Sequence, residues 1–201
     1  MRPVVATGSS APAFPRGYYG HGITPEDVPG WEEARVLAST EVLAAGVETA
    51  EYDHRRPGDR VLVVDDGEQH WKGVGTAKHL AARGHDVAFA MVEGDPGGDL
   101  TGPTKLKLHR QLFDLDNPVD IYSFAFVDAV DWPDVTLETE GQSVTLRDLD
   151  SIVLAGFHRA NDGLTSALSG TDISVHRVGD AVAPRTIMEA IHEGERTARD
   201  L

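Results

Sequence analysis

The stretch VVDDGEQHWKGVGTAKHLAARGHDV, residues 63–87, decides the fold expected for this chain. It continues an apolar run that begins at Arg60 and is typical of a parallel strand buried on both faces. Residues 73–83 then repeat apolar side chains at helical spacing, and residues 86–92 form a second apolar run. The pattern predicts a strand, a loop, a helix and a second parallel strand, which is the opening of a Rossmann-like dinucleotide-binding unit.

The loop of this unit departs from the glycine-rich G-x-G-x-x-G fingerprint. Two fingerprint glycines let the backbone approach a pyrophosphate, and the third lets the helix pack closely on its strand. Aligned on the helix, Gly73 takes the third position, while Glu68 and His70 stand near the first two. Glu93, at the tip of the second strand, is placed to accept a ribose hydroxyl of NAD. Because side chains block the approach and carboxylates repel phosphate, we expect no NAD(P) binding through Gly73 and Glu93.

The same acidic loop has two further interpretations. Asp65, Asp66, Glu68 and His70 could form a divalent-cation site, since oxygen ligands suit Mg²⁺ or Ca²⁺. The alternative is a solvated acidic loop in an acid-rich protein. The spacing matches no known cation loop, so the sequence predicts no metal site.

The rest of the chain alternates strands and helices. Strands are expected at residues 3–6, 151–157 and 174–178, helices after Ser39, after Thr101 and over 185–201, and an antiparallel meander over 119–146. In the last helix, Ile187, Ala190, Ile191, Gly194 and Ala198 are expected on the inner side. The fold class predicted is α/β: a parallel sheet with helices plus a small antiparallel meander.

Composition limits the partners and the compartment. The net charge is −15 and the sequence pI is about 4.8, which argues against nucleic acid or an anionic membrane as partner. Abundant Asp with only four Lys favours a halophile's protein. There is no Cys, so an iron–sulfur cluster held by cysteines of this chain is excluded. With no signal peptide or apolar span expected, we predict a cytoplasmic protein.

Five motifs in order resemble a known family. They are VVATGS at 4–9, RVLVVDD at 60–66, LAARGHDV at 80–87, IVLAGFHRANDGL at 152–164 and VGDAVAPRTIMEAIHEGERTAR at 178–199. Together they resemble the two-dinucleotide-binding flavoproteins. Within these flavoproteins, the motifs resemble the C-terminal half of the trimethylamine dehydrogenase and 2,4-dienoyl-CoA reductase group, which is old yellow enzyme-like.

The resemblance implies a division into lobes. Residues 1–50 and 151–201 would form a partial FAD/ADP-type lobe, and residues 51–150 an inserted NAD-type lobe with a degenerate phosphate loop. The candidate FAD or ADP contacts are Ala6, Thr7 and Gly8 in one segment, and Gly179, Asp180 and Ala181 in the other. In the family, the Asp at the position of Asp180 binds the ribityl chain of the flavin.

The same resemblance implies that the reaction centre lies elsewhere. The family opens its flavin lobe with a strand–GxGxxG–helix unit and carries an FMN-binding barrel, and we expect neither within this sequence. No catalytic residue is therefore assigned. The function expected is a cofactor-lobe module or subunit of a flavin-dependent oxidoreductase, acting as a scaffold or docking domain.

Three points stay open at this stage. The partner would be another protein chain, bringing the flavoprotein barrel or the missing FAD half, or a second copy in a homo-oligomer. A different class of function is a self-contained NAD(P)H-dependent reductase whose loop rearranges around the cofactor. A further alternative is a nucleotide-sensing or structural protein.

Overall fold

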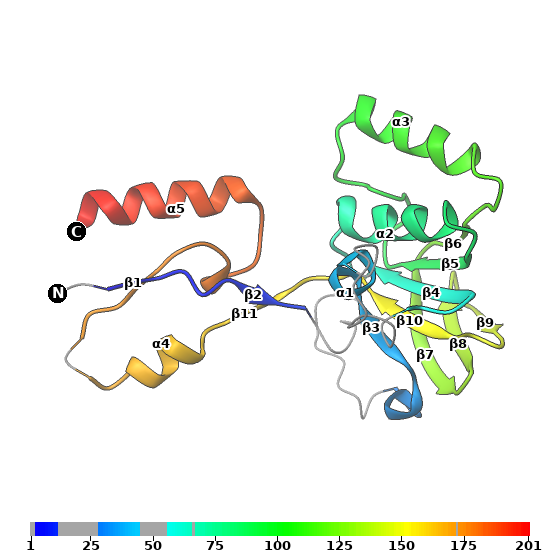
Figure 1. Cartoon of the computed structure of the whole chain (residues 1–201), viewed down its shortest axis with the longest axis horizontal. Helices are drawn as coiled ribbons and strands as arrows, with labels where there is room; N and C mark the ends of the chain where they lie inside the picture. Colours follow the sequence, from blue (N-terminus) through cyan, green and yellow to red (C-terminus); the bar gives the residue numbers. More distant parts are fainter. Residues whose placement is uncertain (1–2, 12–27, 45–55, 66, 172) are drawn as a thin grey trace. The chain divides into compact units, whose positions relative to one another are not determined.

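The chain forms two compact units in the computed structural model (Figure 1), which describes residues 3–11, 28–44, 56–65, 67–171 and 173–201. Unit 1 comprises Met1–Pro12 and Phe157–Leu201, and unit 2 comprises Ala13–Gly156. The lobes expected from the sequence were divided at residues 50 and 151 instead. The division differs because the strands on either side of those points pair with the large sheet of unit 2.

Unit 2 is built on a five-stranded parallel sheet. Its strands, in spatial order, are β3 (Val36–Ala38), β10 (Ser151–Leu154), β4 (Arg60–Asp65), β5 (Asp86–Met91) and β6 (Asp120–Tyr122). Every neighbouring pair is parallel. The solid apolar runs of β4, β5 and β10 are buried, as expected for strands covered on both faces. The α/β fold class is thereby confirmed.

Different layers cover the two faces of this sheet (Figure 1). Val61 and Val63 pack with α1 (Ser39–Ala44), α2 (Trp71–Ala81) and α3 (Gly102–Phe113). Leu62 and Val64 point the other way, because successive strand side chains alternate. They pack against an antiparallel meander of β7 (Ala125–Asp131), β8 (Asp134–Thr139) and β9 (Gln142–Leu146).

The run from Val119 to Asp131, predicted as part of the meander, is two strands in two different sheets. It is interrupted after Tyr122, and Phe124 has a positive φ of 50°. β6 joins the parallel sheet beside β5, whereas β7 starts the meander. The short strand β3, which follows the 3₁₀ helix η3 (Trp31–Glu33), was not predicted. The expected helix end at Gly46 lies outside the described residues.

The described residues of unit 1 form two small ladders, two α-helices and one 3₁₀ turn. β1 (Val4–Val5) pairs in parallel with β12 (His176–Arg177), and β2 (Ser9–Ser10) pairs antiparallel with β11 (Arg159–Ala160). The helices are α4 (Gly163–Leu168), the 3₁₀ turn η5 (Gly179–Ala181) and α5 (Ile187–Asp200). Among the described residues of this unit, only Val5, Val178 and Ala181 are buried apolar side chains.

The inner side predicted for α5 is right for the half-buried Ala190 and Gly194 and wrong for the two isoleucines. Ile187 is 79% exposed and Ile191 is 60% exposed, and no residue of α5 is buried. The helix instead turns Ala190 and Glu193 toward η5, where Gly179 N donates a hydrogen bond of 2.8 Å to Glu193 Oε2. This charge-assisted hydrogen bond holds the polar side of α5, rather than its isoleucines, against η5.

The described part of the chain contains no helix long and apolar enough to cross a membrane.

Candidate functional site

The loop after β4 is closed by a buried carboxylate. Asp65 is 4% exposed, and its Oδ1 accepts hydrogen bonds from the backbone N–H groups of Gly67 at 3.1 Å and Glu68 at 2.9 Å. In a dinucleotide-binding unit, such loop amides and the start of the helix receive the phosphate. Here the chain's own carboxylate occupies two of those donors.

The first turn of α2 packs directly on this carboxylate. Gly73 is buried, and a Cβ built on it would lie 2.7 Å from Asp65 Cβ and 2.8 Å from Asp65 Cγ. The close packing predicted at Gly73 is present, although its neighbour is a side chain rather than the strand backbone. The carboxylate also lies where the positive end of the helix favours negative charge.

A lysine of the first turn of α2 reaches the chain just beyond β10. The strand order runs in opposite directions from the neighbouring strands β10 and β4, and open α/β sheets bind ligands outside the carboxyl ends of the strands at such a switch point. Lys72 Nζ donates a hydrogen bond of 2.9 Å to the carbonyl oxygen of Gly156, just beyond β10. The same Nζ lies 3.8 Å from Glu68 Oε1. Both contacts join residues of unit 2.

The depression at the ends of β4 and β5 is small and acidic. It has a volume of about 180 Å³, counting space open to solvent, and is lined by Asp65, Gly67, Gln69, Met91, Val92, Glu93, Asp95 and Gly97. Glu93 lies here as expected, but beside two other carboxylates. The Gln69 carbonyl oxygen accepts from Asp99 N at 3.1 Å, which ties the phosphate loop to the loop after β5.

The possible metal ligands of the loop do not converge in the described residues. No group of three or more His, Asp or Glu side chains in them is placed to hold a metal ion. Asp65 faces the loop amides, and Glu68 Oε2 accepts from His70 N at 3.3 Å. Asp66 lies outside the described residues.

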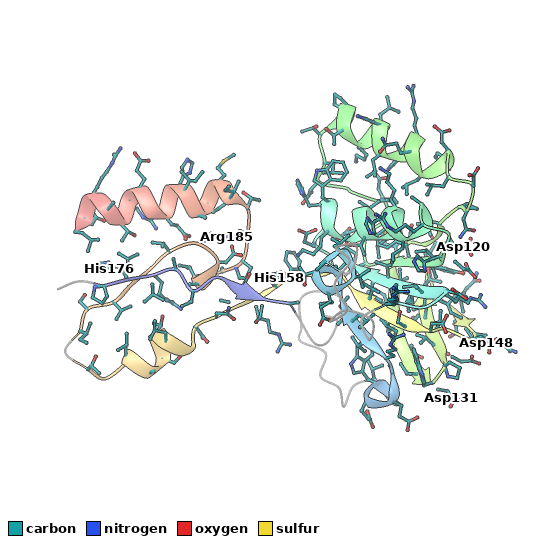
Figure 2. All side chains as sticks on the ribbon, in the orientation of Figure 1. Asp120, Asp131, Asp148, His158, His176 and Arg185 are labelled. Atoms are coloured by element: carbon teal, nitrogen blue, oxygen red, sulfur yellow. The ribbon has the colours of Figure 1, made fainter. Side chains whose placement is uncertain are left out.

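In unit 1 the two segments expected to contact FAD or ADP lie together. Val178 N donates to the Val5 carbonyl oxygen at 3.1 Å, beside Ala6 and Gly179. Ser9 Oγ donates to Asp180 Oδ2 at 2.8 Å and lies 3.2 Å from Nδ1 of His158, which is labelled in Figure 2. Ala181 is fully buried.

The polar groups of these segments are used inside unit 1. Thr7 Oγ1 donates to the Asn161 carbonyl oxygen at 2.5 Å, and the Gly8 carbonyl oxygen accepts from Asn161 N at 3.0 Å. The Gly179 N–H is held by Glu193, which also pairs with Arg185. Asp180 is held by Ser9. These polar groups of the two segments thus have hydrogen-bond partners within unit 1.

The role of Asp65 was not predicted from the sequence. The acidic side chains were expected to repel phosphate, whereas Asp65 binds the loop amides itself. The signal was present: an Asp directly after a buried strand and two residues before a Gly is typical of a turn closed by the Asp side chain. The Lys72 contact to Gly156 had no such local signal, because it joins residues far apart in sequence.

Comparison with known proteins finds structural likeness only. No family model matches the chain, and no curated protein matches it. A 2-naphthoyl-CoA reductase in complex with 2-naphthoyl-CoA is similar over 98% of this chain, with 21% identity and a TM-score of 0.71. Histamine dehydrogenase from Rhizobium sp. 4-9 is similar over 98% of the chain, with 22% identity and a TM-score of 0.76.

A flavoprotein disulfide reductase from Escherichia coli is similar over 98% of this chain and 44% of its own, with 14% identity and a TM-score of 0.63. The chain spans about a quarter of the first two proteins, 26% and 28% of their lengths. At these identities the likeness establishes architecture rather than activity. The chain has the α/β fold of the FAD- and NAD(P)-binding flavoproteins.

Proposed function

We propose that this chain is a cofactor-lobe module of a flavin-dependent oxidoreductase, in which the NAD-type lobe does not bind a dinucleotide. It serves as a scaffold that docks another chain and does not catalyse by itself. The structural neighbours named as reductases and dehydrogenases support the oxidoreductase class. The loop after β4 in this chain supports the absence of dinucleotide binding.

The observation that carries the proposal is the buried Asp65 carboxylate on the amides of Gly67 and Glu68. A pyrophosphate needs those amides and the start of α2, and it would meet a fixed negative charge there. The negative charges of the pyrophosphate and of the Asp65 carboxylate would repel each other strongly, because the carboxylate is poorly solvated. Glu93 and Asp95 add to the negative field of the same depression.

The exposed apolar side chains of unit 1 support the docking role. Its described residues bury only three apolar side chains, and both of its α-helices lack a buried residue. A unit of this size needs a larger core to be stable alone. Exposed apolar side chains on three elements, Val4, Leu164 and Ile187 among them, would be covered by a chain that completes the lobe.

The test is the visible absorption spectrum of the purified full chain after incubation with excess FAD and removal of free ligand. We expect no bound flavin and no NADH or NADPH oxidation, because Ser9 and Glu193 occupy the groups that would hold the cofactor. The matched comparison is Glu193→Gln, which weakens the bond on the Gly179 amide while keeping the side chain's shape.

Stoichiometric flavin on the unmodified chain together with turnover of NADH would overturn the proposal. That result would favour the self-contained reductase instead. Bound flavin without turnover would reassign the chain as a flavin-binding module and contradict its role as a bare scaffold.

A further inference from the structure

The helices α2 and α3 form a cationic layer on an acidic chain. They lie on the same side of the parallel sheet (Figure 1), and neither helix contains an Asp or a Glu. They hold five of the chain's 18 Lys and Arg residues, including every lysine: Lys72, Lys78, Lys105, Lys107 and Arg110. All 33 Asp and Glu lie elsewhere in the sequence. A local positive surface on a chain of charge −15 can select a negatively charged partner.

Three of these cations have no carboxylate partner among the described residues. Lys78 Nζ donates a hydrogen bond of 2.7 Å to Gln111 Oε1, which is a neutral acceptor. Lys107 and Arg110 are exposed, and neither takes part in a salt bridge in the described part of the chain. Gln111 follows Lys107 by one helical turn, so Lys78 extends this positive surface from α3 to α2. The other two lysines are paired with carboxylates of unit 2.

The exposed side of α3 also presents two large apolar side chains. Leu106 is 56% exposed and Phe113 is 85% exposed. At about 100° per residue, Leu106, Arg110 and Phe113 lie within about 60° of one another, opposite the buried Leu108 and Leu112. We call Leu106, Lys107, Arg110 and Phe113 the α3 stripe. Two exposed apolar side chains together with cations on one side of a helix mark an interaction surface.

We propose that the α3 stripe binds an acidic amphipathic segment of another protein. Apolar side chains of that segment cover Leu106 and Phe113, and its carboxylates pair with Lys107 and Arg110. Lys78 adds a third cation at the edge of the contact. The contact uses unit 2, whereas the docking surface of the proposed function lies on unit 1, so this inference does not rest on that function.

The size of the cationic layer favours a short acidic polypeptide over a nucleic acid. α3 has 12 residues, which gives a length of about 18 Å at 1.5 Å per residue. A nucleic acid repeats its phosphates at regular spacing and would continue from this helix onto a surface that carries the chain's carboxylates. An amphipathic segment as long as α3 stays within the cationic layer, and it also covers the two apolar side chains.

The test is the fluorescence anisotropy of a labelled peptide titrated with the full chain at about 0.15 M KCl, where exposed charges still interact over about 8 Å. The peptide has the length of α3, with Leu at helical spacing on one side and Glu at the other positions. Such a peptide is repelled by a chain of charge −15 unless it meets a local cationic surface. We expect saturable binding, and weaker binding of a peptide with the same composition in scrambled order.

Substitutions separate the α3 stripe from the effect of net charge. Phe113→Ser and Arg110→Glu should each weaken binding of the peptide at least about tenfold. Leu43→Ser, which removes a 42% exposed apolar side chain of α1, is the matched control for the first variant. Arg147→Glu is the control for the second, since this exposed residue follows β9 in the layer on the opposite face of the sheet. Both controls should leave the Kd unchanged.

Three results would overturn the proposal. The first is the absence of saturable binding of the acidic amphipathic peptide to the unmodified chain, or equal binding of the scrambled peptide. The second is an equal loss of binding with Arg110→Glu and Arg147→Glu, which would show an effect of net charge alone. The third is binding of duplex DNA that Arg110→Glu abolishes, which would assign this face to a nucleic acid.

Discussion

At the scale of single residues, the account rests on Asp65 and Gly73. Asp65 satisfies two loop amides that would otherwise need a ligand or water, and its burial is tolerated because those hydrogen bonds offset the loss of hydration. Gly73 has no side chain, and this lets the first turn of α2 approach the carboxylate. The two residues therefore depend on each other.

Gly73→Ala should destabilise the chain by about 1–3 kcal/mol, because the added Cβ overlaps Asp65 in a packed site. Gly75→Ala in the same helix is the matched control, since a Cβ there meets nothing within 4 Å. It should stabilise the helix by about 0.5–1 kcal/mol. Denaturant unfolding of the two variants measures both values. Equal midpoints for the two variants would show that α2 does not pack on Asp65 as described.

Among the secondary-structure elements, those with long apolar patterns were predicted most accurately. β4, β5 and α3 lie close to their predicted places, because a strand buried on both faces and a helix with one buried side each produce a recognisable pattern of apolar residues along the sequence. β3 was missed since three residues carry no periodicity. The isoleucines of α5 were placed on the wrong side because the hydrogen bond from Gly179 N to Glu193, which brings the polar side of the helix to η5, is a tertiary contact that the local pattern does not contain.

The start of α5 should respond to pH. Thr186 and Glu189 form a capping box, and the hydrogen bond from the Thr186 side chain lowers the pKa of Glu189, with the helix-start backbone bonds acting the same way. A lowered carboxyl pKa stabilises the folded helix above the unfolded pKa, and that contribution is lost as pH falls through the folded pKa. Helical Cα chemical shifts of Ile187 and Met188 should therefore decrease as the solution is acidified below the usual Glu range.

Thr186→Ala should reduce this acid-dependent change, because the side chain that lowers the pKa of Glu189 most is gone while the backbone hydrogen bonds remain. The control is Glu195→Gln, which lies in α5 but outside the cap. This variant should keep the acid-dependent change in chemical shift. Shifts of the first turn that are independent of pH in the unmodified chain would contradict the capping role.

At the scale of the whole molecule, net charge and buried contacts act in opposite directions. A charge of −15 on 201 residues repels itself in the folded state, while the sheet of unit 2 holds a continuous apolar core on both faces. The net charge follows directly from the sequence. The contacts by which Asp65 and Lys72 fill the phosphate position could not be predicted, because they depend on the three-dimensional positions of these side chains.

Thermal stability should rise with salt. The screening length falls from ~30 Å at 0.01 M to ~3 Å at 1 M, so repulsion among the excess carboxylates is strongly reduced. The unfolding midpoint by circular dichroism should increase steadily from low to molar KCl. A midpoint that does not change over this range would count against the halophilic interpretation of the composition.

The most direct test of the central claim, that the chain's own carboxylate occupies the phosphate position of the NAD-type lobe, is a calorimetric titration of the unmodified protein with NADH and with NADPH. We predict no binding heat for either ligand at millimolar concentration, since Asp65 holds the amides of Gly67 and Glu68 and the Lys72 side chain is bound to the Gly156 carbonyl oxygen. Saturable binding of either dinucleotide at micromolar concentration would show that the loop opens to phosphate and would contradict the account.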